Sequence, residues 1–188
     1  MTDPVRLQDP VELPVSLEAA RQQLVVYGYD DDDELIKQYI RSATDELERT
    51  LNVSLTEETW QQSYSSFTTS LILWINPVTN LLKVTYYDAD NVLQVMPADT
   101  YFLTRSGSTA CVQFKAQSFP VLLYPRPDAV CVEFKAGFKR DRVPASLKAA
   151  ILMHVNMLYA SRGDRTEISM SENLAYNRLI WPHRRPRV

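Results

Sequence analysis

Consecutive carboxylates from Asp30 to Glu34 are the densest group of potential metal ligands in this 188-residue sequence. A calcium-binding EF-hand loop needs glycine at its sixth position and glutamate at its twelfth. Counted from Asp30, these positions hold Leu35 and Arg41, so the motif fails. Carboxylates are also favoured at a helix N-terminus by capping and by the helix dipole, and the run predicts such a helix start. The alternative is an acidic surface that faces a partner or a channel, formed by Asp30, Asp31 and Asp32.

The other candidates for catalysis or metal binding have no matching motif. His154 has no second ligand three or four residues away, which predicts a histidine in the core or at a subunit interface. Ser106-Gly107-Ser108 departs from the G-x-S-x-G pattern, and the sequence contains neither a P-loop nor G-x-G-x-x-G. Cys111 and Cys131 are too few for a disulfide scaffold; they could be strand neighbours, but buried reduced thiols are predicted. The sequence therefore predicts no enzyme and no metal or cofactor.

Composition indicates a globular protein whose acidic and basic residues are unevenly distributed along the chain. Apolar residues make up 45% of the chain and charged residues 23%, and no apolar run approaches the roughly 18 residues of a membrane span. The N-terminus has no pattern of a secretory signal, so we expect a cytosolic protein without membrane contact. Residues 1–60 hold 14 acidic against 5 basic residues, and residues 61–188 hold 9 against 15. This asymmetry suits head-to-tail contacts between copies or with a partner, and the acidic first third argues against a nucleic-acid-binding module.

Helical periodicity is confined to the two ends of the chain. Three prolines predict an extended arm over residues 1–15, followed by a short helix that Ser16 caps and that runs from Leu17 to about Tyr27, with Gly28 ending it. A second helix is predicted from Asp33 to Asn52.

The C-terminal part returns to helix. A helix from Pro144 to about Ser161 is apolar on nearly every side, so more than one neighbour must cover it. A last helix is predicted to begin near Ser171 and to stop before Pro182.

The middle of the chain has the alternation of β-strands. Strands are predicted over residues 59–64, 70–75, 81–87, 92–96, 101–104, 110–116 and 129–134. Residues 111–116 and 131–136 are near-copies of one hexapeptide, whose alternation turns Val112, Phe114, Val132 and Phe134 toward the core.

These elements predict an α+β fold, because helices and strands occupy separate parts of the sequence and do not alternate. Two N-terminal and two C-terminal helices flank an inserted antiparallel β-rich domain. The predicted parts are residues 1–56 (arm and helices), 57–140 (β-rich insert), 141–181 (helices) and 182–188 (basic tail).

The C-terminal segment combines arginines with an aromatic residue, which are types enriched at interface anchors. The residues concerned are Arg178, Trp181, His183, Arg184, Arg185 and Arg187. A solvated tail, docking onto a partner protein and contact with nucleic-acid phosphates all remain open from the sequence.

Several motifs, and the order in which they follow one another, resemble the head–tail connector (adaptor) proteins of tailed phages. The resemblance is to the longer branch of this family, which has a β-rich insert. The resemblance spans about residues 12–181 and is carried by residues 14–20, 31–40, 84–90, 132–138 and 143–151. Asn52 stands where this family usually has glycine, a C-cap substitution that the left-handed conformation tolerates.

The resemblance implies a structural protein of the virion neck, made in the bacterial host cytoplasm. It implies a ring, usually of twelve copies, beneath the portal; the ring extends the DNA channel without sequence-specific binding and carries the next connector or the tail. It further implies no catalysis, with the helices 33–52 and 144–161 forming the core and much of the subunit seam. On this basis residues 178–188 are expected to reach the portal or a neighbour, and Asp30, Asp31 and Asp32 to face the channel. A tail-completion protein of the same virion is the nearest alternative.

Overall fold

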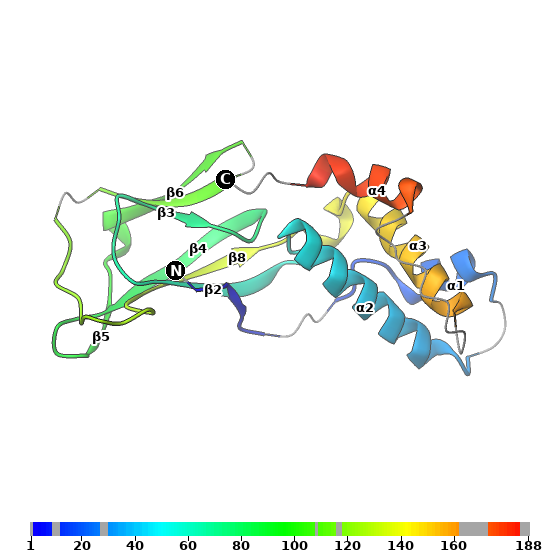
Figure 1. The fold of residues 1–188 in the computed structure, drawn as a ribbon, viewed down its shortest axis with the longest axis horizontal. Coiled ribbons are helices and arrows are strands. Elements are labelled where there is room, and N and C mark those ends of the chain that lie inside the picture. The colour runs from blue at the N-terminus through cyan, green and yellow to red at the C-terminus, as the bar shows by residue number, and fades with distance from the viewer. Residues whose placement is uncertain are drawn as a thin grey trace. The chain divides into compact units, whose positions relative to one another are not determined.

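The computed structural model describes residues 2–8, 12–26, 30–107, 109–115, 118–161 and 173–184. In these residues the chain forms α-helices and antiparallel β-sheets, so the predicted α+β class is confirmed (Figure 1). It divides into a β unit, Met1–Pro10 with Glu57–Phe138, and a helical unit, Val11–Thr56 with Lys139–Val188. Among the helices of the described residues, none has the length and apolar character needed to span a bilayer.

The N-terminal arm corrects the predicted domain boundaries. We expected residues 1–56 to belong with the helices, yet Met1–Pro10 groups with the β unit. The reason is a two-residue strand, β1 (Val5–Arg6), which pairs antiparallel with β2 (Glu58–Tyr64). The backbone amide of Leu7 extends this pairing by donating to the Thr59 carbonyl at 3.0 Å.

The first helix begins at its predicted cap, and the second ends at its predicted cap. The hydroxyl of Ser16 accepts a hydrogen bond from the Ala19 amide at the start of α1 (Leu17–Leu24). Helix α1 ends earlier than predicted, at Val25 in the left-handed conformation; Tyr27 and Gly28 lie outside the described residues. Helix α2 (Asp33–Leu51) ends at Asn52 with φ 52°, which confirms the predicted C-cap.

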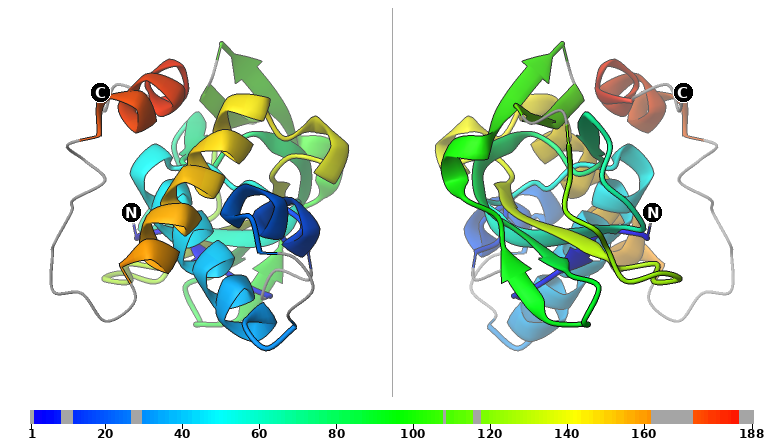
Figure 2. Two further views of the ribbon diagram at one scale, coloured as in Figure 1. Left: turned by 90° about the vertical axis from the view of Figure 1, so that its right-hand side faces the viewer. Right: turned by 90° about the vertical axis from the view of Figure 1, so that its left-hand side faces the viewer.

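Helix α3 (Ala145–Ala160) is the centre of the helical unit. It contacts α1, α2 and α4 (Leu174–Ile180), so the expectation that several neighbours cover an apolar helix is confirmed (Figure 2, left). Helix α4 begins after the N-cap Asn173, and the predicted start, Ser171, lies outside the described residues. Pro182 is tolerated in a 3-10 turn, Trp181–His183, because proline fits the first turn of a helix.

The β unit consists of two antiparallel sheets. The larger sheet has the order β1-β2-β8-β4-β5 and the smaller one β3-β7-β6. The remaining strands are β3 (Ser70–Leu73), β4 (Val78–Tyr87), β5 (Leu93–Val95), β6 (Tyr101–Ser106), β7 (Thr109–Phe114) and β8 (Val130–Ala136). Strand β4 starts earlier than predicted because Val78 already pairs with Ala136, before two irregularities in the register.

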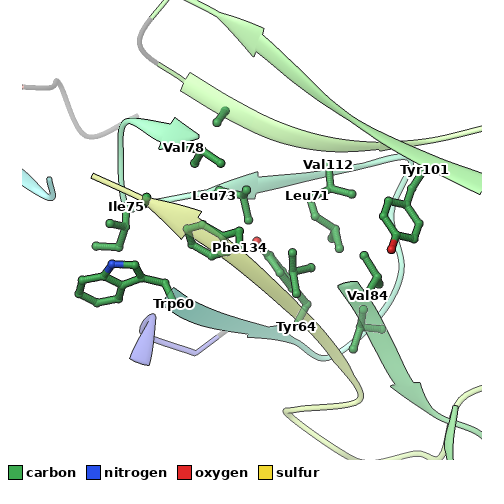
Figure 3. Packing of buried hydrophobic residues seen from close by; sticks show 14 of the residues in the cluster. Trp60, Tyr64, Leu71, Leu73, Ile75, Val78, Val84, Tyr101, Val112 and Phe134 are labelled. Carbon is green, nitrogen blue, oxygen red and sulfur yellow. The ribbon is translucent and has the colours of Figure 1, made fainter. Parts of the chain in front are cut away.

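The two near-identical hexapeptides lie in different sheets. Val112 and Phe114 of β7, and Val132 and Phe134 of β8, are all buried in one hydrophobic cluster, as their alternation predicts. Figure 3 shows Val112 and Phe134 within this cluster. Cys111 and Cys131 are free thiols and are not strand neighbours, because Cys111 pairs with Ile72 and Thr104, whereas Cys131 pairs with Ser63 and Thr85. Cys131 is buried and Cys111 half-buried.

Side chains bridge the two sheets. From β2, the buried Gln62 donates to the Ile72 carbonyl and accepts from the Trp74 amide, both at 3.0 Å. The Tyr64 hydroxyl donates to the same Ile72 carbonyl at 2.6 Å. From β6, the guanidinium of Arg105 donates to the backbone carbonyls of β4 at 3.0–3.2 Å. These bonds hold strands of the small sheet against strands of the large one.

Candidate partner-docking surface

The acidic run joins α1 to α2 through one arginine. Arg21, in the last turn of α1, donates to Asp33 at 2.7 Å and to Asp30 at 2.5 Å. These hydrogen bonds, that to Asp33 first, raise the pKa of Arg21. Asp33 and Glu34 also lie in the first turn of α2, where the helix dipole favours negative charge. The carboxylates of this run therefore stabilise the start of α2, as predicted.

Asp32 differs from the capping prediction. It occupies the N-cap position of α2, but its side chain makes no capping hydrogen bond. Its carboxylate instead accepts a hydrogen bond from the Tyr159 hydroxyl at 2.6 Å, which links the start of α2 to the end of α3. Asp31 is exposed. Among the described residues, no three His, Cys, Asp or Glu side chains are grouped so that they could hold a metal ion.

The C-terminal segment is docked on the helical unit as far as Arg184. Tyr176 and Ile180 of α4 are buried, at 4% and 1% exposure. Beyond α4, the His183 ring shares a hydrogen bond with the Ser146 hydroxyl at 2.9 Å. A solvated tail therefore does not begin before residue 185, and Arg185 and Arg187 lie outside the described residues.

The opposite side of α4 carries exposed residues at helical spacing. Leu174 and Trp181 are 75% and 69% exposed, and the exposed Arg178 lies between them at i+4. The Arg184 guanidinium carbon lies 5.8 Å from the centre of the Trp181 ring, and this guanidinium donates to the Asn177 side chain at 3.2 Å. We call Leu174, Arg178, Trp181 and Arg184 the α4 stripe.

The two predicted groups of site residues lie at opposite ends of α3. The acidic group is anchored at Tyr159 and the C-terminal segment at Ser146, which is roughly 20 Å away at 1.5 Å per helical residue. Sequence reasoning missed these anchors and Arg21. By its sequence, the helix that carries Tyr159 is apolar on nearly every side, although a partly buried tyrosine hydroxyl usually finds a partner. That rule is the one signal that would have pointed to it.

His154 is buried in the helical unit, in agreement with the prediction. Its Nε2 lies 3.6 Å from a Glu46 carboxylate oxygen, and its ring packs edge-on against Tyr176. Within the described part of the chain, its Nδ1 has no hydrogen-bond partner. Burial lowers the pKa of His154 and outweighs the opposing effect of Glu46. Burial also raises the pKa of Tyr176 to about 12, so that this neighbour stays neutral.

The lowered pKa of His154 predicts a loss of stability in acid. The unfolded chain takes up the proton near pH 6.5, before the folded chain does. The contribution of His154 is therefore complete above about pH 6.5 and declines as the pH falls below that value. We expect the urea midpoint of the wild-type chain to fall more between pH 7.5 and pH 5 than that of His154→Gln. Parallel midpoints across this range would contradict the prediction.

Comparisons with known proteins identify relatives of this fold. The sequence model of the phage gp6-like head-tail connector proteins matches residues 14–95, which hold α1, α2 and β2 to β5. The neck of an empty gene transfer agent (GTA) particle, computed with C6 symmetry, contains a similar chain, with TM-score 0.83 and 18% identity. The native GTA virion and the native GTA neck computed with C12 symmetry contain matches with TM-scores of 0.78 and 0.76, also at 18% identity. Each match covers 100% of this chain and 97% of the other. No curated protein sequence matches.

These findings confirm the resemblance to head–tail connectors that the sequence motifs predict. The family match includes the two segments that opened that resemblance, residues 14–20 and 31–40. The structural matches extend the shared fold over the whole chain.

Proposed function

We propose that this chain, a relative of the gp6-like head–tail connectors, is a structural protein of a virion neck. The observation that carries the proposal is the connector match over residues 14–95. The fold shared with chains of GTA necks and virions supports it. The protein connects head and tail, and it has no catalytic role.

The functional assembly in this proposal is a ring of copies of this chain beneath the portal. The necks that contain similar chains were computed with C6 and C12 symmetry, which supports a ring of twelve copies here. In such a ring each subunit presents two different surfaces to its neighbours. The ring extends the channel through which DNA passes without sequence-specific contact, and it carries the next connector or the tail.

Two surfaces of the helical unit, the α4 stripe and the acidic group, would contact the portal and line the channel. The α4 stripe docks onto the portal, because an exposed tryptophan beside arginines is typical of interface hot spots. Arg185 and Arg187 follow Arg184 in the sequence and add positive charge to this segment. The acidic group, Asp30 to Asp32, faces the channel, where negative charge keeps DNA from adhering.

Native mass spectrometry with negative-stain images tests this function. The chain is measured alone and after mixing with the portal ring of the same particle. We expect rings of twelve 21.6-kDa copies, about 259 kDa, either free or on the portal. A chain that forms no ring and does not bind the portal would overturn the proposal.

Truncation after Ile180 tests the docking role of the C-terminal segment. The shortened chain keeps the buried Tyr176 and Ile180 but loses Trp181 and Arg184. Loss of one hot spot of about 2 kcal/mol predicts portal binding at least about 30-fold weaker, with an unchanged circular dichroism spectrum.

A matched control separates docking from folding. Ser146→Ala removes the hydrogen bond to His183, which the truncation also removes, but keeps the α4 stripe. This variant should bind the portal like the wild-type chain. Normal binding by the truncated chain would contradict the proposed role of the segment.

A further inference from the structure

The C-terminal segment packs on α3 through α4 (Figure 1), and both histidines of the chain lie at this contact. The ring of His154, on α3, packs edge-on against that of Tyr176, on α4, with the ring centroids 6.2 Å apart. The ring of His183, which follows α4, shares its hydrogen bond with the Ser146 hydroxyl of α3. A proton taken up by either ring therefore places a charge at this contact.

His154 lies where a positive charge is poorly accommodated, because the residue is only 4% exposed. When the imidazole is protonated, both ring nitrogens carry a hydrogen and both need an acceptor. Nε2 has a Glu46 carboxylate oxygen 3.6 Å away, on a side chain that is 57% exposed, whereas Nδ1 has no partner among the described residues. A buried donor without an acceptor costs free energy, and a charged one costs more.

The helices packed against α3 offer a protonated His154 little negative charge. The segment Leu174–Arg184 contains no carboxylate. Glu46 of α2 is the charged group that acts on His154 within the described part of the chain, and burial of the ring outweighs it. The charged residues of α1, Glu18 and Arg21, do not add to this effect.

Helix α4 depends on the same contact for its stability. It is seven residues long, and isolated helices shorter than roughly 12 residues are marginal in water. Its two buried side chains are those of Tyr176 and Ile180. Burial raises the pKa of Tyr176 to about 12, Glu46 acts in the same direction, and Arg184 opposes them, so the phenol stays neutral and supplies no charge. A change at the His154 ring therefore reaches one of the two side chains that hold α4 in place.

We propose that protonation of His154 detaches α4 from α3 while α1, α2 and α3 stay packed together. The detachment goes beyond the proposed neck function; its effect on docking rests on that function, because α4 carries the α4 stripe. Burial lowers the pKa of His154, so α4 stays in place at neutral pH and detaches as the pH falls below about 6.5, the ordinary value for histidine.

Amide hydrogen exchange of the full chain at pH 7.5 and pH 5 tests the detachment, with each rate divided by the intrinsic rate at the same pH. The Asn177 amide, which donates to the Asn173 carbonyl at 2.9 Å, reports on α4, and the amide of the buried Leu47 reports on α2. We expect protection at Asn177 to fall roughly tenfold more than protection at Leu47. An equal fall at both amides would overturn the proposal, because acid would then loosen the helical unit as a whole.

Three variants make the result specific to His154. His154→Gln should remove the acid response at Asn177, whereas His183→Gln, which deletes the other imidazole and keeps a polar side chain near Ser146, should retain it. Glu46→Gln changes a largely exposed side chain and deletes the carboxylate that favours the protonated ring, so the acid response should grow severalfold. An unchanged response in His154→Gln would overturn the proposal. An unchanged or smaller response in Glu46→Gln would also overturn it, and this variant decides by itself where His154→Gln does not fold.

Binding to the portal ring at the same two pH values separates this inference from the proposed function. We expect the wild-type chain to lose more affinity at pH 5 than His154→Gln does, and an equal loss would overturn the effect on docking. Portal binding without any acid-dependent difference between Asn177 and Leu47 would overturn the detachment and leave the neck function standing. The expected exchange in a chain that does not bind the portal at pH 7.5 would support the detachment and count against the neck function.

Discussion

Replacing Gln62 by methionine and Tyr64 by phenylalanine together should destabilise the β unit by more than the sum of the single changes. Both side chains donate to the Ile72 carbonyl, and Gln62 also accepts from the Trp74 amide. Each single change leaves this carbonyl one of its two side-chain donors, whereas the double change leaves it neither. We expect about 2 kcal/mol for Gln62→Met, about 1 kcal/mol for Tyr64→Phe and roughly 1–2 kcal/mol beyond their sum for the pair.

Urea unfolding followed by tryptophan fluorescence measures this effect, because Trp60 and Trp74 both lie in the β unit. Burial raises the pKa of Tyr64, so its hydroxyl remains a donor throughout the neutral range. Gln113→Met is the matched control, because Gln113 lies on the outer side of β7 and should change stability by less than about 0.5 kcal/mol. Strict additivity of the two single changes would contradict the shared-carbonyl explanation.

The helices could be predicted because their signals are local. Helix α2 begins at Asp33 and ends before Asn52 as predicted, since the apolar spacing and the C-cap both lie within the segment. The end of α1 could not be predicted in this way. Val25 adopts φ 58°, a conformation that β-branched residues rarely take and that no local pattern indicates.

The sheets show the limit of local patterns more clearly. Alternation correctly predicts that Phe114 and Phe134 point into the core, but their near-identical hexapeptides contain nothing that assigns them to different sheets. Strand pairing decides that assignment, and it depends on residues far away in the sequence. Strand β1 was missed for the same reason, because two residues become a strand only by pairing with β2.

The candidate site was predictable by residue type but not by contact. The arginines and tryptophan of residues 178–184 are of types enriched at interface anchors, and the structure exposes Arg178, Trp181 and Arg184; that they bind a partner stays a prediction. The hydrogen bonds that hold the candidate site residues in place join residues far apart in the sequence, so no local pattern predicts them. The bond of His183 to Ser146 joins residues 37 positions apart, and that of Asp32 to Tyr159 joins residues 127 positions apart.

The pair of Arg6 and Glu58 predicts that a second substitution restores stability. The Arg6 Nε lies 2.7 Å from a Glu58 carboxylate oxygen, and the Glu58 side chain is only 5% exposed. Removing one partner of a buried ion pair costs about 3–5 kcal/mol, because the remaining charge stays in a poorly solvated place. Arg6→Met should approach the lower end of this range, since detachment of the short strand β1 admits water to Glu58.

Glu58→Gln in the Arg6→Met background removes the buried charge and should recover at least about 1 kcal/mol of the loss. Glu58→Gln alone should cost less than Arg6→Met alone, because a guanidinium that is 21% exposed reaches water more easily than the carboxylate does. Hydrogen exchange at the Leu7 amide, which donates to the Thr59 carbonyl, reports detachment of β1 separately from global unfolding. If the double variant is less stable than Arg6→Met, or if exchange at Leu7 stays at the wild-type rate in Arg6→Met, the ion pair does not hold β1 on the sheet.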